Sequence, residues 1–256
     1  AAGGAARLRK YCKGERKMNV YEIKSMGERI KGNSYVGRGI TVGKSAGGKY
    51  AAAAYFIMGR SENSRNRIFA ESGDDVTIFP FDESKVEDPS LIIYSPIRKL
   101  DNRLIVTNGD QTDTICNFLK TKRNFIQALN TRGFEPDKPN FTPRISTMLT
   151  FDKSNFSYDM SILKSIDENG SACSRFTFSY PSVSGLGHFI HTYNCDGNPI
   201  PSFTGEPERV SVPDSIDEFT NDIWNNLDEN NRVSLYVRYI DLETGEAENR
   251  MINKNK

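Results

Sequence analysis

Arginine-rich segments give the first indication of chemistry in this chain. Residues 59–67 (GRSENSRNR) follow an apolar run and contain three arginines, two serines and two asparagines. Guanidinium groups bind phosphate or carboxylate groups bidentately, and Ser and Asn side chains supply orienting hydrogen bonds. Three arginines so close together repel one another unless an anion or carboxylates lie among them. A polar hairpin loop is the alternative, and we favour an anion site.

Two further segments carry single residues that could take part in chemistry. In residues 35–39 (YVGRG), glycines on both sides of Arg38 leave its guanidinium unobstructed, although alone this pattern is more typical of a solvated arginine. Tyr94 ends an apolar run shortly before Pro96. Its phenol is either packed in the core, which is the commoner case, or available as a proton donor.

Acidic residues occur in two loops that follow these segments. Residues 106–114 (VTNGDQTDT) predict a strand, a glycine turn and a helix start, which points free backbone N–H groups at a ligand. Asp110 and Asp113 would repel a phosphate, so they either cap the helix, Asp113 being the favoured cap, or pair with the arginines of residues 35–39 and 59–67. Residues 134–145 contain three prolines and predict a stiff loop. Glu135 there is a proton acceptor if desolvated, and otherwise an ordinary exposed glutamate.

Composition excludes several classes of function. The 34 Lys and Arg against 33 Asp and Glu in 256 residues show no basic excess, so nucleic acid is not an expected partner. No run approaches the roughly 18 apolar residues of a membrane helix, and residues 1–10 lack a signal-peptide core. We expect a cytoplasmic protein with no membrane partner, and a homo-oligomer stays open.

Metal ligation is not expected. His188 and His191 are the only histidines, and their spacing on a predicted strand points them to opposite faces. The four cysteines lack CxxC spacing and predict free thiols. They are Cys12, Cys116, Cys173 and Cys195.

Short apolar runs separated by Gly, Pro, Asn and Asp predict sheets that position these residues. One group of neighbouring strands, covered on both faces and with ends that border a site, is expected at Ala51–Met58, Leu91–Ile97 and Leu104–Thr107. A second sheet is expected from Tyr158–Lys164, Arg175–Tyr180, His188–Tyr193 and Arg232–Ile240, the last with Val233, Leu235, Val237 and Tyr239 alternating inward.

Two amphipathic helices are expected to pack outside the sheets. The first starts at Thr112/Asp113, carries Ile115, Phe118, Leu119, Ile126 and Leu129 on one face, and ends before Gly133. The second spans Asp214–Leu227, with Ser215 and Glu218 as a capping box. A further helical stretch is expected around Val20–Lys31. Together these elements predict a layered α+β fold, with sheet packed on sheet.

The order of the polar segments resembles one known family. The matching set is Tyr35-x-Gly37-Arg38, Arg60-Ser61 with Asn66-Arg67, Tyr94, Val106-Thr107-Asn108-Gly109 with Thr112-Asp113, and Thr142-Pro143-Arg144-Ile145. In content and order, residues 31–145 resemble the archaeal-type IMP cyclohydrolases. The resemblance implies a four-layer αββα sandwich similar to N-terminal nucleophile hydrolases, without their nucleophile. It places one domain at residues 31–256 after an N-terminal extension at residues 1–30.

The implied reaction is the ring closure of 5-formamidoimidazole-4-carboxamide ribonucleotide to IMP, which needs no cofactor or metal. The resemblance implies Arg67 as the group that stabilises the formyl oxygen or orients the base, Tyr94 as proton donor and Glu135 as acceptor. Arg65 is an alternative to Arg67. The implied binders of phosphate, ribose and imidazole-carboxamide are Arg38, Arg60, Ser61, Asn66, Asn108, Gly109 and Arg144, with Asp110 optional.

Two other functions compete with this hypothesis. A purine ribonucleotide-binding or regulatory protein would have the same pocket without efficient turnover. An amidohydrolase of the broader fold would need an activated nucleophile, and the printed sequence begins with Ala1 rather than Cys, Ser or Thr. We rank the amidohydrolase last.

Overall fold

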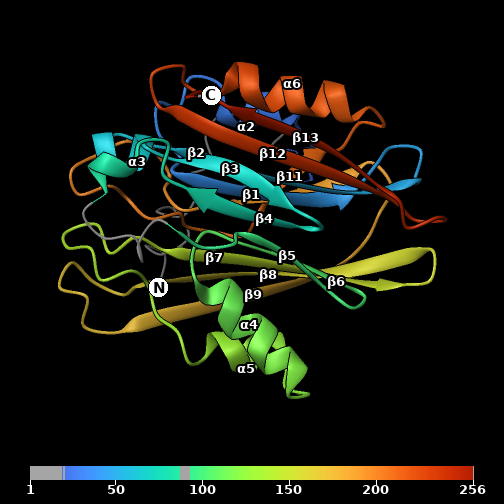
Figure 1. Ribbon diagram of the computed structural model, residues 1–256, viewed down its shortest axis with the longest axis horizontal. Coiled ribbons are helices and arrows are strands. Elements are labelled where there is room, and N and C mark those ends of the chain that lie inside the picture. Colours follow the sequence, from blue (N-terminus) through green and yellow to red (C-terminus); the bar gives the residue numbers. More distant parts are fainter. Residues whose placement is uncertain (1–18, 20, 87–92, 256) are drawn as a thin grey trace, which may run out of the picture.

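Two antiparallel sheets lie face to face in the computed structural model, which describes residues 19, 21–86 and 93–255 (Figure 1). Helices α2 (Met26–Ile30) and α6 (Ile216–Asn226) cover the outer face of one sheet. Helices α4 (Gln111–Lys120) and α5 (Phe125–Leu129) cover the outer face of the other. The expected α+β class, with sheet packed on sheet and helices outside, is confirmed.

The first sheet has six strands in the order β11-β10-β1-β2-β12-β13. Its strands are β1 (Arg38–Lys44), β2 (Tyr50–Met58), β10 (Leu186–His191), β11 (Glu208–Ser211), β12 (Arg232–Asp241) and β13 (Ala247–Asn253). As predicted, β2 is covered on both faces, since every residue from Ala51 to Met58 is buried. Ala53, Tyr55 and Ile57 face the other sheet, whereas Ala54, Phe56 and Met58 face the helices.

The second sheet has seven strands in the order β3-β4-β5-β6-β7-β8-β9, which is their order along the chain. Its strands are β3 (Ile68–Ser72), β4 (Asp75–Phe79), β5 (Ile97–Leu100), β6 (Arg103–Thr107), β7 (Arg144–Asp152), β8 (Asn155–Ser165) and β9 (Cys173–Pro181). The one-turn helix α3 (Glu62–Arg65) links the first sheet to β3, and a short 3-10 helix, η1 (Glu83–Lys85), follows β4. Each strand pairs with its sequence neighbour, so short turns build most of this sheet.

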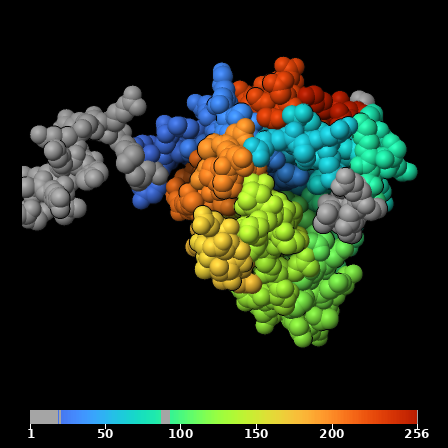
Figure 2. Space-filling model, turned by 90° about the vertical axis from the view of Figure 1, so that its left-hand side faces the viewer, coloured from blue at the N-terminus to red at the C-terminus, as the bar shows by residue number. Residues whose placement is uncertain are grey.

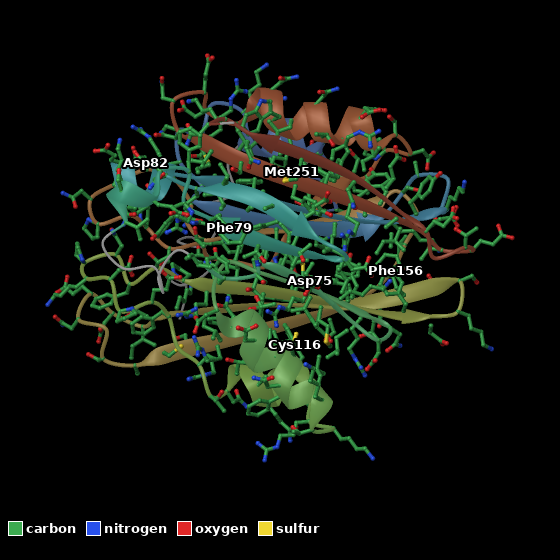
Figure 3. The ribbon with its side chains drawn as sticks, viewed as in Figure 1. Asp75, Phe79, Asp82, Cys116, Phe156 and Met251 are labelled. Carbon is green, nitrogen blue, oxygen red and sulfur yellow. The ribbon has the colours of Figure 1, made fainter. Side chains whose placement is uncertain are left out.

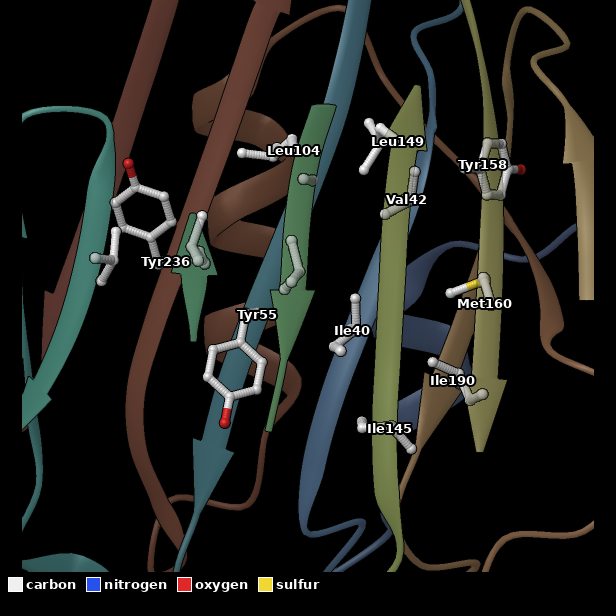
Figure 4. Packing of buried hydrophobic residues seen from close by; sticks show 14 of the residues in the cluster. Ile40, Val42, Tyr55, Leu104, Ile145, Leu149, Tyr158, Met160, Ile190 and Tyr236 are labelled. Carbon is white, nitrogen blue, oxygen red and sulfur yellow. The ribbon is translucent and has the colours of Figure 1, made fainter. Parts of the chain in front are cut away.

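Three apolar clusters hold these layers together. The largest lies between the sheets and includes Ile40, Tyr55, Leu104, Leu149 and Met160 (Figure 4). A second joins the six-stranded sheet to α2 and α6, and a third joins the seven-stranded sheet to α4 and α5. The functional site is therefore bordered by closely packed layers.

The predicted division of strands between the sheets is wrong. The expected first group mixes β2 of one sheet with β5 and β6 of the other, and the expected second group mixes β8 and β9 with β10 and β12. Strand burial follows from apolar periodicity, but pairing depends on where the chain crosses between layers, which periodicity does not report. In β12 both faces are buried, because Tyr236 and Arg238 are covered as fully as Leu235 and Val237.

Several predicted boundaries also change. The strand expected at Leu91–Ile97 begins only at Ile97; residues 93–96 are not strand, and residues 91 and 92 lie outside the described part of the chain. The expected helix after Asp113 is two helices, because Lys122 adopts a left-handed φ of 61° between α4 and α5. Ile126, expected on the buried stripe, is 51% exposed.

The other helices partly follow the prediction. In α6 the Ser215 side chain accepts from the Glu218 backbone N–H, and Ile216, Phe219 and Ile223 are buried as expected. In the described part of the stretch around Val20–Lys31, the one helix is the short α2, which Ser25 and Glu28 cap reciprocally. Met26 and Ile30 of that helix are buried in the second cluster. Among the described residues, no helix has the length and apolar character needed to span a membrane.

Candidate active site

A cavity of about 570 Å³ opens at one end of the two sheets, a volume typical of small-molecule sites. It lies where β2 and β6 end and where β1 and β7 begin. Figure 2 views this side of the molecule, where the cyan, yellow-green and orange segments meet. The lining residues are Tyr35, Arg38, Arg60, Ser61, Asn63, Ser64, Arg67, Tyr94, Asn108, Gly109, Asp110, Glu135, Pro136, Asp137, Asn140, Thr142, Arg144, Tyr193 and Ile200.

Arg38 and Arg67 are two of the four arginines that line this cavity. Neither has an acidic partner within ion-pair distance among residues 21–86 and 93–255, and the buried Nε of Arg67 has no hydrogen-bond partner there. Burial, and then the charge of Arg38, lowers the pKa of Arg67. Two like charges facing one cavity are stabilised by an anion placed between them.

The glycine before Arg38 allows the chain to bring Arg38 to the cavity. Gly37 has a φ of 78°, and a Cβ there would lie 2.1 Å from Oγ1 of Thr192 and 2.6 Å from the ring of Tyr193. Only glycine fits this left-handed position against those side chains. The glycine noted in the sequence therefore sets the path of the chain into β1.

Tyr94 reaches the cavity from the irregular segment just before β5 and is 8% exposed. Its hydroxyl lies 3.1 Å from the hydroxyl of Tyr55, which comes from β2 in the opposite sheet. Burial raises the pKa of Tyr94, although Arg67 and Arg38 oppose the shift. The phenol is therefore neutral at physiological pH and can donate a proton.

Glu135 is half-buried in the loop before β7. The backbone N–H of Glu135 donates to the carbonyl of Thr142 at 2.9 Å. The hydroxyl and the backbone N–H of Thr142 both donate to the carboxylate of Asp137. Burial raises the pKa of Glu135, opposed by Arg144 and Arg38. A carboxylate with a raised pKa is a stronger base than an exposed glutamate, which suits a proton acceptor.

Arg144 is held at the cavity wall by a charged network. Its Nη1 donates to Asp110 at 2.6 Å and to Oε1 of Gln111 at 2.7 Å, and Arg132 also pairs with Asp110. Burial alone would raise the pKa of Asp110, but Arg144 and Arg132 lower it below its ordinary value. Asp113 does not cap α4, contrary to the prediction; it pairs with Arg98 at 2.8 Å. Both aspartates do pair with arginines, but with Arg98, Arg132 and Arg144 rather than with the arginines of residues 35–39 and 59–67 that the prediction offered.

Arg60 lies at the exposed rim of the cavity. Its guanidinium pairs with Asp196, donates to the carbonyl of Gly197 at 2.9 Å, and lies 5.3 Å from the ring centre of Tyr35. Tyr35 in turn stacks on Tyr193 at 5.8 Å. Flat aromatic and guanidinium surfaces of this kind suit a planar heterocycle.

Nine of the ten site residues expected from the sequence line this cavity, and Asn66 does not. Asn66 is 5% exposed, and its amide exchanges hydrogen bonds of 2.7 and 2.8 Å with the backbone of Asp82, beside α3 in Figure 3. Arg65, the alternative to Arg67, is also directed away, because it binds the carbonyl of Gly59 and the side chain of Asn231. Both residues stabilise the loop instead of lining the cavity.

Asn108 lines the cavity, but its amide group is already occupied. It donates to the carbonyl of Pro143 at 2.9 Å and accepts from the backbone N–H of Ile145 at 2.8 Å. These bonds fix the start of β7 and hence Arg144. Asn108 therefore contributes mainly by fixing the backbone that shapes the site.

The histidines lie on opposite faces of the strand, as predicted. His188 faces the other sheet, where its Nδ1 lies 2.6 Å from the Tyr158 hydroxyl and burial lowers its pKa to about 4. His191 lies beside Glu208, with 3.7 Å between Nε2 and the carboxylate. In the part of the chain that the structure describes, no three His, Cys, Asp or Glu side chains form a metal-binding group. Cys116, Cys173 and Cys195 are free thiols, and Cys12 lies outside the described residues.

The sequence did not reveal several lining residues. Tyr35, Asn140 and Thr142 stood inside quoted segments without an assigned role, while Tyr193 and Ile200 come from segments that carried no recognised signal of a site. Tyr193 and Ile200 reach the cavity only because the chain returns to it after β10. A local pattern does not report such a return.

The fold and this cavity define an α+β protein with an arginine- and tyrosine-rich pocket at one end of two stacked sheets. Comparison with known proteins agrees: the family model described as IMP cyclohydrolase-like protein matches residues 35–246. The chain therefore belongs to the IMP cyclohydrolase-like family, which confirms the resemblance found in residues 31–145.

Three archaeal relatives named IMP cyclohydrolase show the extent of the similarity. The chain is 28% identical over 165 residues to that of Methanococcus aeolicus, covering 63% of this chain and 75% of the relative. It is 35% identical over 121 residues to that of Methanocella arvoryzae, covering 45% and 58%. It is 33% identical over 118 residues to that of Methanocaldococcus jannaschii, covering 45% and 56%. The chain thus spans between just over half and three quarters of these relatives.

Proposed function

We propose that this protein is an IMP cyclohydrolase, which closes the second ring of the purine by converting 5-formamidoimidazole-4-carboxamide ribonucleotide to IMP and water. One observation supports this above all others: Arg67, Tyr94 and Glu135, from three distant segments, line a single cavity. That cavity also carries Arg38, Arg60 and Arg144, which suit a phosphorylated substrate. Family membership and the names of the relatives agree.

In the proposed reaction, the carboxamide nitrogen attacks the formyl carbon and a C–N bond forms. Glu135 accepts a proton from that nitrogen, and Tyr94 donates a proton to the formyl oxygen as its negative charge develops. Arg67 stabilises the same oxygen electrostatically. The oxygen then leaves as water with a second proton, which originates from the formamido nitrogen. No electrons are exchanged with a second reactant.

The remaining pocket residues are proposed to hold the nucleotide. Arg144 with the backbone at Gly109, and Arg60 with Ser61, supply donors at two sides of the cavity. Tyr35, whose ring stacks on Tyr193, offers an aromatic surface to the planar ring of the substrate. Fixing the reacting groups side by side accounts for much of the rate enhancement in an intramolecular ring closure.

We also propose that the layers form a four-layer αββα sandwich similar to the N-terminal nucleophile hydrolases. The three apolar clusters, one between the sheets and one under each pair of helices, support that arrangement. We propose one domain at residues 31–256 after the extension at residues 1–30, and a cytoplasmic location, where phosphorylated nucleotides are retained.

An ultraviolet absorbance assay tests the proposed function. Purified protein without added metal is expected to convert the formamido ribonucleotide to IMP. Inactivity combined with tight binding of IMP would instead favour a purine ribonucleotide-binding or regulatory protein. Inactivity without any nucleotide binding would exclude both.

A further inference from the structure

Tyr55 is a buried tyrosine that does not line the cavity yet contacts a residue that does. It lies in the middle of β2 with 0% of its surface exposed, and its hydroxyl is 3.1 Å from that of Tyr94. The ring packs against Phe69 at 5.6 Å within the apolar cluster between the sheets. The contact therefore joins the six-stranded sheet to the proposed proton donor.

A buried hydroxyl is unfavourable unless it has a hydrogen-bond partner. Phenylalanine would fill nearly the same volume without a polar group. Across residues 21–86 and 93–255, Tyr94 is the only hydrogen-bond partner of the Tyr55 hydroxyl. The contact with Tyr94 therefore compensates the burial of the Tyr55 hydroxyl.

Tyr55 and Tyr94 differ in how firmly their backbone is held. Tyr55 belongs to a central strand that pairs along its length with β1 and β12. Tyr94 lies outside any strand, and its carbonyl accepts one bond from the N–H of Ile78 at 2.9 Å. The rigid element can thus fix the position of the hydroxyl on the irregular one.

We propose that Tyr55 is a positioning residue that donates its hydroxyl hydrogen to the oxygen of Tyr94, so that the hydrogen of Tyr94 points into the cavity. This inference rests on the proposed function. When the Tyr94 O–H bond breaks and a new O–H bond forms on the formyl oxygen, Tyr94 becomes a phenolate. The hydrogen bond from Tyr55 stabilises that phenolate while Tyr55 keeps its own proton. Tyr94 then recovers a proton from Glu135, which accepted it from the carboxamide nitrogen of the substrate.

The surroundings of Tyr55 suit the role of a donor. Burial, and then the neighbouring Tyr94, raises the pKa of Tyr55 well above its ordinary value. Arg38 and Arg67 lower it, but burial dominates. Tyr55 therefore remains protonated while Tyr94 gains and loses its proton.

Tyr55→Phe in the full chain tests the proposal, because the ring is kept and only the hydroxyl is lost. We expect kcat to fall about tenfold or more while KM changes less than about threefold. Loss of a hydrogen bond that favours the phenolate should also move the alkaline limb of the pH–rate profile upward by about one pH unit. A merely structural role would not move that limb.

Tyr236→Phe is the matched control. Tyr236 pairs with Tyr55 in register and lies in the same apolar cluster, but its hydroxyl points the opposite way and contacts Glu71 at 2.9 Å and Arg238 at 2.8 Å (Figure 4). It should lower the thermal midpoint and leave the pH–rate profile unchanged. The proposal is overturned if Tyr55→Phe keeps its kcat and profile, or if both variants shift the profile equally.

A second measurement separates this inference from the proposed function. The protein is labelled at the tyrosine ring carbon that bears the hydroxyl, and NMR follows the titration of each tyrosine. The signal that is missing in Tyr94→Phe is assigned to Tyr94. Tyr55→Phe should raise the titration midpoint of Tyr94 even without substrate. A wild-type protein that does not turn over refutes the proposed function, whereas an unchanged Tyr94 midpoint refutes the role of Tyr55.

Discussion

A methyl group added at Gly109 would lie 2.5 Å from Nη1 of Arg144 and 2.6 Å from Oε1 of Gln111. Asp110 also binds Arg144, so the position of the guanidinium at the cavity wall is restricted. A side chain between β6 and α4 would therefore displace the end of an arginine that lies 35 residues later in the sequence.

Gly109→Ala should displace Arg144 and weaken substrate binding. We expect KM to rise about tenfold with kcat changed much less, because the contact serves binding more than chemistry. Steady-state kinetics gives both values. Gly133→Ala is the control, since a Cβ there meets no atom within 4 Å and its φ is not in the left-handed region. Equal kinetics for the two variants would contradict this account of Arg144.

Arg67→Met should abolish turnover and yet stabilise the free protein. The substitution removes a buried Nε without a partner and relieves repulsion from Arg38. A gain of about 1 kcal/mol would raise the unfolding midpoint by roughly 2–4 °C for a chain of this size. Calorimetry measures it without ligand. Arg65→Met, which loses bonds to Gly59 and Asn231, should instead lower the midpoint; a lower midpoint for Arg67→Met would be contrary to our expectation.

The pH dependence should report Glu135. As a proton acceptor it must be ionised, so kcat/KM should fall on the acid side with a midpoint above the ordinary glutamate value. A carboxyl whose pKa is raised by folding stabilises the protein below its unfolded pKa and loses that contribution as the pH rises through the folded pKa. Glu135→Gln should therefore be more stable than wild type at pH 7, with the difference vanishing at low pH.

Urea unfolding at several pH values measures this effect, and turnover of Glu135→Gln should fall by about 100- to 10,000-fold. The exposed Glu229→Gln is the control and should change neither quantity. An acid limb that persists in Glu135→Gln would assign the titration to another group.

Asn66 and Asn63 should behave oppositely although they share one loop. Asn66→Ala loses two hydrogen bonds to the Asp82 backbone, so we expect a loss of about 2 kcal/mol of unfolding free energy with KM unchanged. Asn63 is exposed and lines the cavity, so Asn63→Ala should raise KM and leave stability unchanged. Denaturant unfolding and kinetics on both variants check this. The reverse pattern would restore Asn66 as a binding residue.

Nine of the ten residues expected from the sequence line one cavity because the polar residues are concentrated in short segments. Arg38 stands between glycines, Arg67 belongs to an arginine cluster and Tyr94 ends an apolar run, positions that sequence patterns report well. Asn66 was misassigned because an amide that binds a ligand and one that binds the backbone of Asp82 look the same in a sequence. Tyr55 was absent because a tyrosine within an apolar strand predicts only core.

The fold was predicted to its class and not to its pairing. The buried faces of β2 followed from its composition, but whether Leu104 lies beside β2 or across from it depends on the crossing after Met58. The break at Lys122 was missed because apolar periodicity continues through Phe125. Contacts between distant segments decide these features, and local patterns do not encode them.

The most direct test of the central claim is the turnover of Tyr94→Phe. If the Tyr94 phenol donates the proton in ring closure, kcat should fall by about 100- to 10,000-fold, while calorimetric affinity for IMP stays within about threefold of wild type. Tyr21→Phe, at a tyrosine that is 73% exposed, should behave as wild type. Wild-type turnover in Tyr94→Phe would contradict the account.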